Sequence, residues 1–244
     1  MLKLLTIKQT SDKLGVSSQT LRRWDKSGQF ASIRNKDNNY RCYKKEDIED
    51  YIKNNTKDLF KIARNWVIDD LGTEPQKDFY CQDSIVFQAR LERLKNEMSK
   101  MQNMEKTYSL IVGIAGEIGS NSFDHNLGNW PDIRGMFFAY NLKKRKIILA
   151  DRGQGILTTL KKVKPELINH QNALQTAFTE VISGRAPEAR GNGLKFVRQV
   201  VSNNEINLFF QSGDAELRME KNNFDLYIKK STVNFHGCLV LIHF

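Results

Sequence analysis

The sequence EIGSNSFDHN at residues 117–126 decides how the second half of the chain folds. Residues three, four and seven apart share one face of a helix, so Glu117, Asn121 and Asp124 form a polar stripe. The neighbouring apolar stripe consists of Leu110, Ile114 and Ile118. Residues 108–125 are therefore predicted to form an amphipathic helix, whose apolar side packs on a sheet while a carboxylate and an amide face a polar group. Taken alone, the segment also fits a surface helix with a solvated face.

A strand and a glycine-containing turn follow this helix. Residues 141–146 form a charged turn, and the apolar run Ile147-Ile148-Leu149-Ala150 after it is typical of a buried strand. The next five residues, Asp151-Arg152-Gly153-Gln154-Gly155, place a carboxylate at the strand end with two glycines behind it. Glycine lets the backbone approach a bound group closely, so these residues suit a hydrogen-bonded ligand. The alternative is a tight turn with a capping aspartate.

A second glycine-rich segment precedes another predicted helix. Arg190-Gly191-Asn192-Gly193-Leu194 leads into the apolar-rich residues 195–201, which have a helical pattern. A glycine-rich loop before a helix N-terminus presents free backbone N–H groups and a positive dipole end, which suits phosphate. Two glycines in this spacing are common, so the segment is informative only together with the two before it.

The three segments EIGSNSFDHN, ADRGQGI and GRAPEARGNGL stand in the order and spacing of the boxes of the GHKL ATP-binding fold. Gyrase, a heat-shock chaperone class, histidine kinases and the MutL repair proteins share that fold, and the resemblance covers residues 108–244. It implies an α/β sandwich with helices on one face of a mixed, mostly antiparallel sheet. The apolar run at residues 236–244 fits the closing strand of such a domain, buried on both faces.

The resemblance also implies roles for the matching residues, with ATP and Mg²⁺ as cofactors. Glu117 would align or deprotonate the attacking water, and Asn121 would hold Mg²⁺. Asp151 would accept a hydrogen bond from the adenine amino group, with Gly153 and Gly155 shaping the adenine wall. The remaining nucleotide-binding positions implied by the resemblance are Asp124 in the first box and Gly191 and Gly193, which would close on the phosphates.

The activity of such a pocket stays open at this stage. Lys195 stands where many kinases of this fold have a further glycine, and with Arg185 and Arg190 it would either add charge around the phosphates or be solvated. The histidine at position 125, at the end of the first box, resembles the first box of the anti-sigma kinases. A Ser/Thr protein kinase localised to DNA is therefore the alternative to a Mg²⁺-dependent ATPase or nucleotide switch. Residues 84–104 contain no histidine, which argues against phosphorylation of a histidine in that helix. A pure binding module with a decayed pocket is a third alternative.

The N-terminal residues carry a separate pattern. Residues 6–24, TIKQTSDKLGVSSQTLRRW, predict a short helix, a glycine-containing turn and a second helix with Ser17 as its N-cap. The second helix buries Leu21 and Trp24 on one side. Its other side presents Ser18, Gln19, Arg22 and Arg23. Short polar side chains and arginines are what base edges and phosphates require.

Residues 1–54 resemble the winged helix-turn-helix of the MerR and excisionase group. The matching stretches are residues 16–24 and Tyr40-Arg41-Cys42-Tyr43, with Asp47 after them. The resemblance implies that the second helix enters the major groove of double-stranded DNA and that Arg41, on a two-stranded wing, contacts the phosphate backbone. The alternative is a three-helix module that binds protein.

Positive charge is concentrated in the same region. Residues 1–57 contain 13 Lys and Arg but 7 Asp and Glu, a net charge of +6, against +10 for all 244 residues. Such an excess is the electrostatic footprint of a domain that contacts phosphates. A basic surface also suits an anionic membrane, but the sequence has no amphipathic basic helix or lipidation motif to support that alternative.

These patterns predict an α+β chain with residues 1–54 as the DNA-binding domain, 55–107 as a helical connector and 108–244 as the ATP-binding domain. In the connector, four apolar residues have the spacing of a coiled-coil seam: Phe87, Leu91, Leu94 and Met98. This segment is either a dimerisation helix or a helix packed along the ATP-binding domain. We expect a regulator whose nucleotide state biases DNA binding or assembly, with homodimerisation and a protein partner both left open.

Cellular location is predicted from what the sequence lacks. There is no signal peptide and no apolar run long enough to span a bilayer. The three cysteines are scattered, without metal-ligand spacing, which favours free thiols in a reducing cytoplasm.

Overall fold

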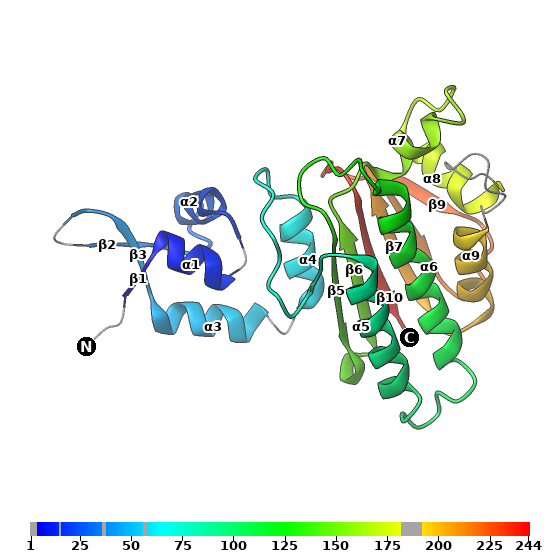
Figure 1. Ribbon diagram of the computed structural model, residues 1–244, viewed down its shortest axis with the longest axis horizontal. Helices are drawn as coiled ribbons and strands as arrows, with labels where there is room; N and C mark the ends of the chain where they lie inside the picture. The colour runs from blue at the N-terminus through cyan, green and yellow to red at the C-terminus, as the bar shows by residue number, and fades with distance from the viewer. Residues whose placement is uncertain (1–3, 15, 36–37, 56–57, 182–191) are drawn as a thin grey trace.

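The N-terminal part of the chain folds as a small helical domain with a three-stranded sheet (Figure 1). The structure is a computed structural model that describes residues 4–14, 16–35, 38–55, 58–181 and 192–244. The elements of this domain are β1 (Leu4–Thr6), α1 (Ile7–Leu14), α2 (Ser18–Lys26), β2 (Ile33–Arg34), β3 (Arg41–Lys44) and α3 (Lys45–Asn55). The strands are antiparallel in the order β1-β3-β2, so the predicted two-stranded wing is confirmed, and β1 adds a third strand that was not expected.

Local sequence signals explain the helices of this domain. The hydroxyl group of Ser17 accepts a hydrogen bond from the Thr20 N–H, which makes Ser17 the N-cap of α2 as predicted. Leu21 and Trp24 are buried, as the spacing of the second helix indicated. They pack with Phe30, Tyr43 and Ile48 in a separate small core.

The C-terminal part is built on a seven-stranded sheet in the order β4-β5-β6-β10-β7-β8-β9. Its strands are β4 (Tyr80–Cys81), β5 (Met136–Asn141), β6 (Lys146–Asp151), β7 (Asn207–Ser212), β8 (Ala215–Met219), β9 (Tyr227–Lys230) and β10 (Cys238–His243). The α+β class is thus confirmed. The six pairings among these strands are all antiparallel, whereas a mixed, mostly antiparallel sheet was expected. The last strand, β10, lies at the centre of the sheet as predicted.

Helices cover both faces of this sheet. The elements are α4 (Leu59–Val67), α5 (Ser84–Met98), α6 (Tyr108–Asn126), η1 (Leu142–Lys144), α7 (Gly155–Lys161), α8 (His170–Thr179) and α9 (Gly193–Asn203). One face packs on α5, α6, α8 and α9, and the other packs on α4. Figure 1 shows α4 between the N-terminal domain and the sheet. Helices were expected on one face only, and α4 corrects that expectation.

The sheet can be buried on both faces because its central strands carry runs of consecutive apolar residues, such as Ile147 to Ala150 on β6 and Leu239 to Ile242 on β10. Successive side chains of a strand point to opposite faces. On β5, Met136 and Phe138 therefore join the cluster beneath α6, while Phe137 and Ala139 join the cluster beneath α4. The same alternation on β6 and β10 fixes the register of all three strands, since a slip by one residue would exchange the two faces.

Residues 55–107, which we expected to form a helical connector, pack on the C-terminal sheet. Their helices α4 and α5 flank the sheet, and β4 pairs with β5 at its edge. The apolar seam of α5 is buried within the chain against α6. A Cβ atom at Gly119 of α6 would overlap the Phe87 ring, so this glycine allows the two helices to approach closely. The alternative of a helix packed along the C-terminal domain is the one observed.

Two other expectations concern the whole chain. Cys42, Cys81 and Cys238 are all free thiols, as expected from their scattered positions. Among the residues that the structure describes, no helix is both long and apolar enough to cross a bilayer.

Candidate functional site

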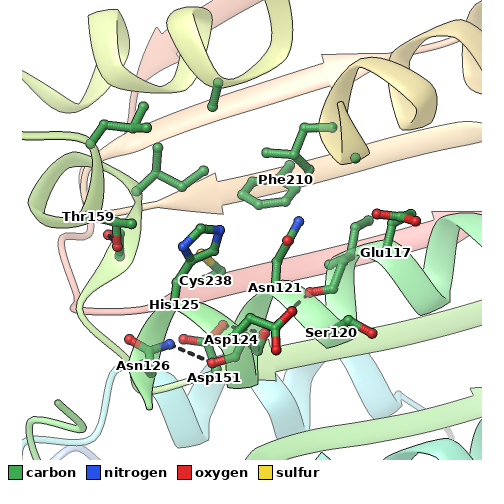
Figure 2. A pocket seen from close by; sticks show the side chains of 18 of the residues that line it. Glu117, Ser120, Asn121, Asp124, His125, Asn126, Asp151, Thr159, Phe210 and Cys238 are labelled. Atoms are coloured by element: carbon green, nitrogen blue, oxygen red, sulfur yellow. Dashed lines mark hydrogen bonds between the residues drawn. The ribbon is translucent and has the colours of Figure 1, made fainter. Parts of the chain in front are cut away.

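A pocket of about 400 Å³ opens between α6 and the end of the sheet (Figure 2). The three sequence segments singled out above converge on it. Six of the predicted residues line the pocket: Glu117, Asn121, Asp124, Asp151, Gly155 and Gly193. Gly153 lies next to the lining residue Asp151, and Gly191 lies outside the described residues. These segments are far apart in sequence and are brought together by the sheet.

Asp151, at the end of β6, is the buried carboxylate of the pocket, with a side chain that is 2% exposed. The Ser122 hydroxyl donates to its Oδ2 atom at 2.8 Å, and the Gly153 N–H donates to its Oδ1 atom at 2.8 Å. Burial raises the pKa of Asp151 to about 6, although these hydrogen bonds act in the opposite direction. At neutral pH a carboxyl group with this pKa is mostly ionised, so it is a strong hydrogen-bond acceptor. Its burial keeps it almost out of contact with water.

The turn after Asp151 is locked against α6. A Cβ atom at Gly153 would overlap the Asn126 side chain, so only glycine fits there. Asn126 accepts a hydrogen bond from the Gln154 N–H at 2.7 Å and donates to the Ser122 carbonyl oxygen at 2.8 Å. Asn126 was not predicted as a site residue, although its place one helical turn after Ser122 was a usable signal.

Glu117 and Asn121 occupy the opposite, more polar end of the pocket. They lie one turn apart on α6, beside the first residue of α9, Gly193. A Cβ atom at Gly193 would come within 2.5 Å of Glu117 Oε2, so a larger residue there would displace the Glu117 carboxylate. The preceding residue, Asn192, makes no side-chain cap for α9. The first two residues of α9, Gly193 and Leu194, line the pocket, so the positive dipole end of this helix lies at the pocket.

An apolar wall completes the pocket, and the sequence did not reveal it. The wall is formed by Ile118, Ile156, Leu160, Ala177, Leu194 and Phe210. These side chains come from α6, α7, α8, α9 and β7, and no local pattern distinguishes them from ordinary core residues. The pocket therefore combines an apolar wall with the buried carboxylate of Asp151.

Of the three basic residues near the third segment, the structure describes Lys195. The Lys195 ammonium donates to the carbonyl oxygen of Glu180, and burial lowers the pKa of Lys195. Arg185 and Arg190 lie outside the described residues. No group of three or more His, Cys, Asp and Glu side chains that could hold a metal occurs in the part of the chain that the structure describes.

The residues predicted to contact DNA lie on a different part of the molecule. Gln19, Arg22 and Arg23 are exposed on α2, and Ser18 is half-buried at its start. Arg41, on β3, is held by a 2.7 Å ion pair between its Nε atom and Asp25 Oδ2. The hydrogen bond from Arg41 lowers the pKa of Asp25 to about 2. Arg41 thus braces the wing against α2.

Comparison with known proteins agrees with the fold of this first domain. Residues 6–43 match the family model described as MerR family regulatory protein. This part of the chain is therefore a helix-turn-helix domain of the MerR type, a DNA-binding regulatory domain. A segment of 66 residues is 42% identical to the type II methyltransferase M.Eco47II of Escherichia coli. That segment covers 25% of this chain and 16% of the methyltransferase.

Proposed function

We propose that this protein is an ATP-binding, DNA-binding regulator, in which the nucleotide state of a GHKL-type domain biases DNA binding or assembly. The observation that carries the proposal is the convergence of three separate segments on one pocket. That pocket combines a buried carboxylate, an apolar wall and an uncapped helix N-terminus, which are the features that a purine nucleotide requires. The methyltransferase relative shares too small a part of its length to suggest its activity here.

Each part of the pocket has a role in this proposal. Asp151 accepts the hydrogen bond from the adenine amino group, and the apolar wall around Phe210 covers the ring. Gly153 and Gly155 shape the turn beside the base. Gly193 and the N-terminus of α9 bind phosphate, as helix N-termini commonly do. Asp124 adds a polar group to the pocket's α6 side.

Glu117 and Asn121 fit the needs of a phosphate-bound Mg²⁺. They offer a carboxylate and an amide oxygen one helical turn apart, and Mg²⁺ is commonly held by one or two protein oxygens together with substrate phosphates. When bound, the ion would neutralise charge on the phosphates. Asn121 would be its ligand, and Glu117 would orient or deprotonate the water that attacks the γ-phosphate.

ATP binding and turnover with Mg²⁺ test this proposal directly. We expect Asp151→Asn to abolish ATP binding, because the amide presents donors where the adenine amino group also donates. We expect Glu117→Ala to retain binding and lose turnover. A wild-type protein that binds no ATP would refute the proposal, and binding without turnover would indicate a switch.

The regulatory half of the proposal needs a second measurement. DNA affinity should differ among the nucleotide-free protein, the ADP complex and the complex with a non-hydrolysable ATP analogue, because a ligand shifts an equilibrium only through differential affinity. Equal affinities in the three states would refute the coupling. A Ser/Thr protein kinase is the second candidate, since His125 lines the pocket. Transfer of label from ATP to a protein would identify it.

A further inference from the structure

The N-terminus of α2, the helix expected to enter DNA, is covered by a loop of the C-terminal part of the chain. This acidic loop consists of Asp69 and Asp70, which follow α4 directly. Asp69 is buried, at 6% exposure, and accepts three hydrogen bonds from the start of α2. The donors are the Ser17 N–H at 3.3 Å, the Ser17 hydroxyl at 3.2 Å and the Thr20 hydroxyl at 2.6 Å.

Two further contacts join the same regions. Asp70 Oδ2 lies 4.0 Å from Arg23 Nη1, although both side chains are well exposed. The Gln76 side chain donates to the carbonyl oxygen of Lys13, at the end of α1, at 3.0 Å. The segment after α4 thus contacts both helices of the helix-turn-helix, through groups that are polar or negatively charged.

This arrangement conflicts with DNA binding. The N-terminal residues of the second helix of a helix-turn-helix contact base edges, and helix N-termini bind phosphate oxygens through their N–H groups. Here the Asp69 carboxylate occupies that position, and a second negative charge lies beside Arg23. A phosphate and two aspartates of the same charge cannot share the site without electrostatic repulsion.

We infer that the acidic loop is autoinhibitory. Its carboxylates occupy the position of DNA phosphates and hold the helix-turn-helix in a state that excludes DNA. Its release would free the Ser17 N–H, the hydroxyl groups of Ser17 and Thr20, and Arg23 for DNA. The contact is made by polar and charged groups, which suits a reversible switch better than an apolar interface would.

The loop is attached to the candidate nucleotide pocket by Arg152. This residue follows Asp151, and its side chain is 2% exposed. Its Nη1 atom donates to the carbonyl oxygens of Trp66 at 2.7 Å and Val67 at 3.2 Å, at the end of α4. The Asp69 loop therefore starts where the residue next to Asp151 holds α4. Release of the loop by nucleotide rests on the proposed function, whereas the autoinhibitory contact itself does not.

The test compares DNA binding by the full chain and by Asp69→Asn. The amide keeps nearly the same shape and an oxygen acceptor but removes the charge. The probe is a random-sequence duplex labelled with a fluorophore, because the phosphate contribution is independent of sequence. We expect Asp69→Asn to bind this duplex about fivefold or more tightly, and Asp69→Asn/Asp70→Asn to steepen the salt dependence by about one phosphate contact.

Asp225→Asn is the matched control, because it makes the same charge change at an exposed position on the loop between β8 and β9. We expect it to alter affinity less than twofold. Binding by Asp69→Asn no tighter than by Asp225→Asn would overturn the inference. If Asp69→Asn unfolds the small domain, Gln76→Ala tests the same contact without a buried charge. Tighter DNA binding by Gln76→Ala supports autoinhibition, and unchanged binding overturns it.

Failure of this inference can be distinguished from failure of the proposed function. Thermal shift with ATP, measured on the same variants, reports the pocket alone. If ATP does not bind and Asp69→Asn still tightens DNA binding, autoinhibition stands without nucleotide control. If ATP binds and Asp69→Asn has no effect on DNA binding, autoinhibition is overturned and the ATP pocket stands.

Discussion

The two regions of this molecule distribute their functional residues in opposite ways. The helix-turn-helix holds its candidate DNA contacts within one continuous segment, which a family model matches over residues 6–43. The candidate pocket takes its lining from residues between Glu117 and Cys238, carried by α6, α7, α8, α9 and three strands. A compact linear motif is recognisable without its fold. A site assembled by a sheet is visible in sequence only through its few glycines and carboxylates.

Arg152→Ala should have the largest effect, because it removes the buried side chain that joins the end of β6 to α4. The guanidinium group donates to Asp132 Oδ2 from Nε at 2.8 Å and from Nη2 at 2.6 Å, in addition to its bonds with α4. Removing it takes two hydrogen bonds from the half-buried Asp132 carboxylate, which keeps His236 and the Ile133 N–H as partners, and takes a donor from two carbonyl groups at the end of α4. We expect the free energy of unfolding to fall by about 3–5 kcal/mol, measured by urea denaturation.

Arg93→Ala is the control for this loss. Arg93 pairs with Glu97 on the exposed surface of α5, at 2.8 Å and in the i,i+4 arrangement. A solvent-exposed pair of this kind contributes little to stability, because water and salt screen it. If the two variants lose similar amounts of stability, Arg152 is not the link between the pocket and α4.

Gly119→Ala and Gly113→Ala test the packing that places α5 against α6. A methyl group at Gly119 would overlap the Phe87 ring, and we expect a loss of about 1–3 kcal/mol from this overpacking. At Gly113 the nearest atoms belong to Phe196, at 3.4 Å, which is ordinary contact. Alanine there should be neutral or stabilise the helix by up to about 1 kcal/mol. Thermal unfolding of both variants checks the difference, and equal stabilities would contradict the close approach of α5.

The structure also explains which parts of the fold the sequence could predict. Helical and strand periodicity are local, so α2, α6, β6 and β10 were predicted close to their observed positions. Trp24 was correctly assigned to the core for the same reason. The position of α4 on the second face of the sheet was missed, because its apolar residues carry no sign of which surface they cover. The sheet was expected to be mixed and mostly antiparallel, and all its strand pairings are antiparallel. Hydrophobic periodicity locates strands but does not give their direction, which depends on the connections between them.

The candidate site divides in the same way. Glu117 and Asn121 were singled out by helical spacing and Asp151 by its place at a strand end, and the resemblance to the GHKL fold gave them their expected roles, whereas Phe210 and the rest of the apolar wall were not predicted. Such residues look like core in any sequence, because a pocket wall and a core have the same composition. The contact of Asp69 with Ser17 was also invisible, since an aspartate after a helix gives no indication of a partner 52 positions away.

Ligand affinity should depend on pH through Asp151. Its pKa of about 6 lies above the usual 3.8, so the folded, ligand-free protein binds this proton more tightly than the unfolded chain does. The contribution to stability is therefore full below pH 3.8 and is lost as the pH rises through 6. Ionisation makes the carboxyl a better acceptor for an adenine amino group. Adenosine affinity should rise about threefold to tenfold between pH 5 and pH 7.

Adenosine is the suitable ligand here because it has no phosphate that titrates in this range. Isothermal titration calorimetry at several pH values measures the change. Asp151→Asn serves as the control, and its thermal stability should show less loss than the wild type as the pH rises from 4 to 7. If the wild-type affinity for adenosine does not change with pH, Asp151 does not bind the adenine base.

Arg41→Ala should have the smallest effect, and it separates a structural arginine from a DNA-contacting one. The Arg41–Asp25 pair is partly exposed, so its loss should cost less than about 1 kcal/mol in urea denaturation at neutral pH. Because the pKa of Asp25 is lowered to about 2, this contribution is present above pH 3.8 and is lost as the pH falls through 2. The stabilities of Arg41→Ala and the wild type should therefore converge as the medium becomes more acidic.

If Arg41→Ala keeps its full stability at pH 7 but weakens binding to a random-sequence duplex and lowers its salt dependence by about one phosphate contact, Arg41 belongs to the DNA surface instead. That result would extend the linear motif of the first region from α2 to the wing, and the ion pair with Asp25 would then be one that DNA phosphate displaces.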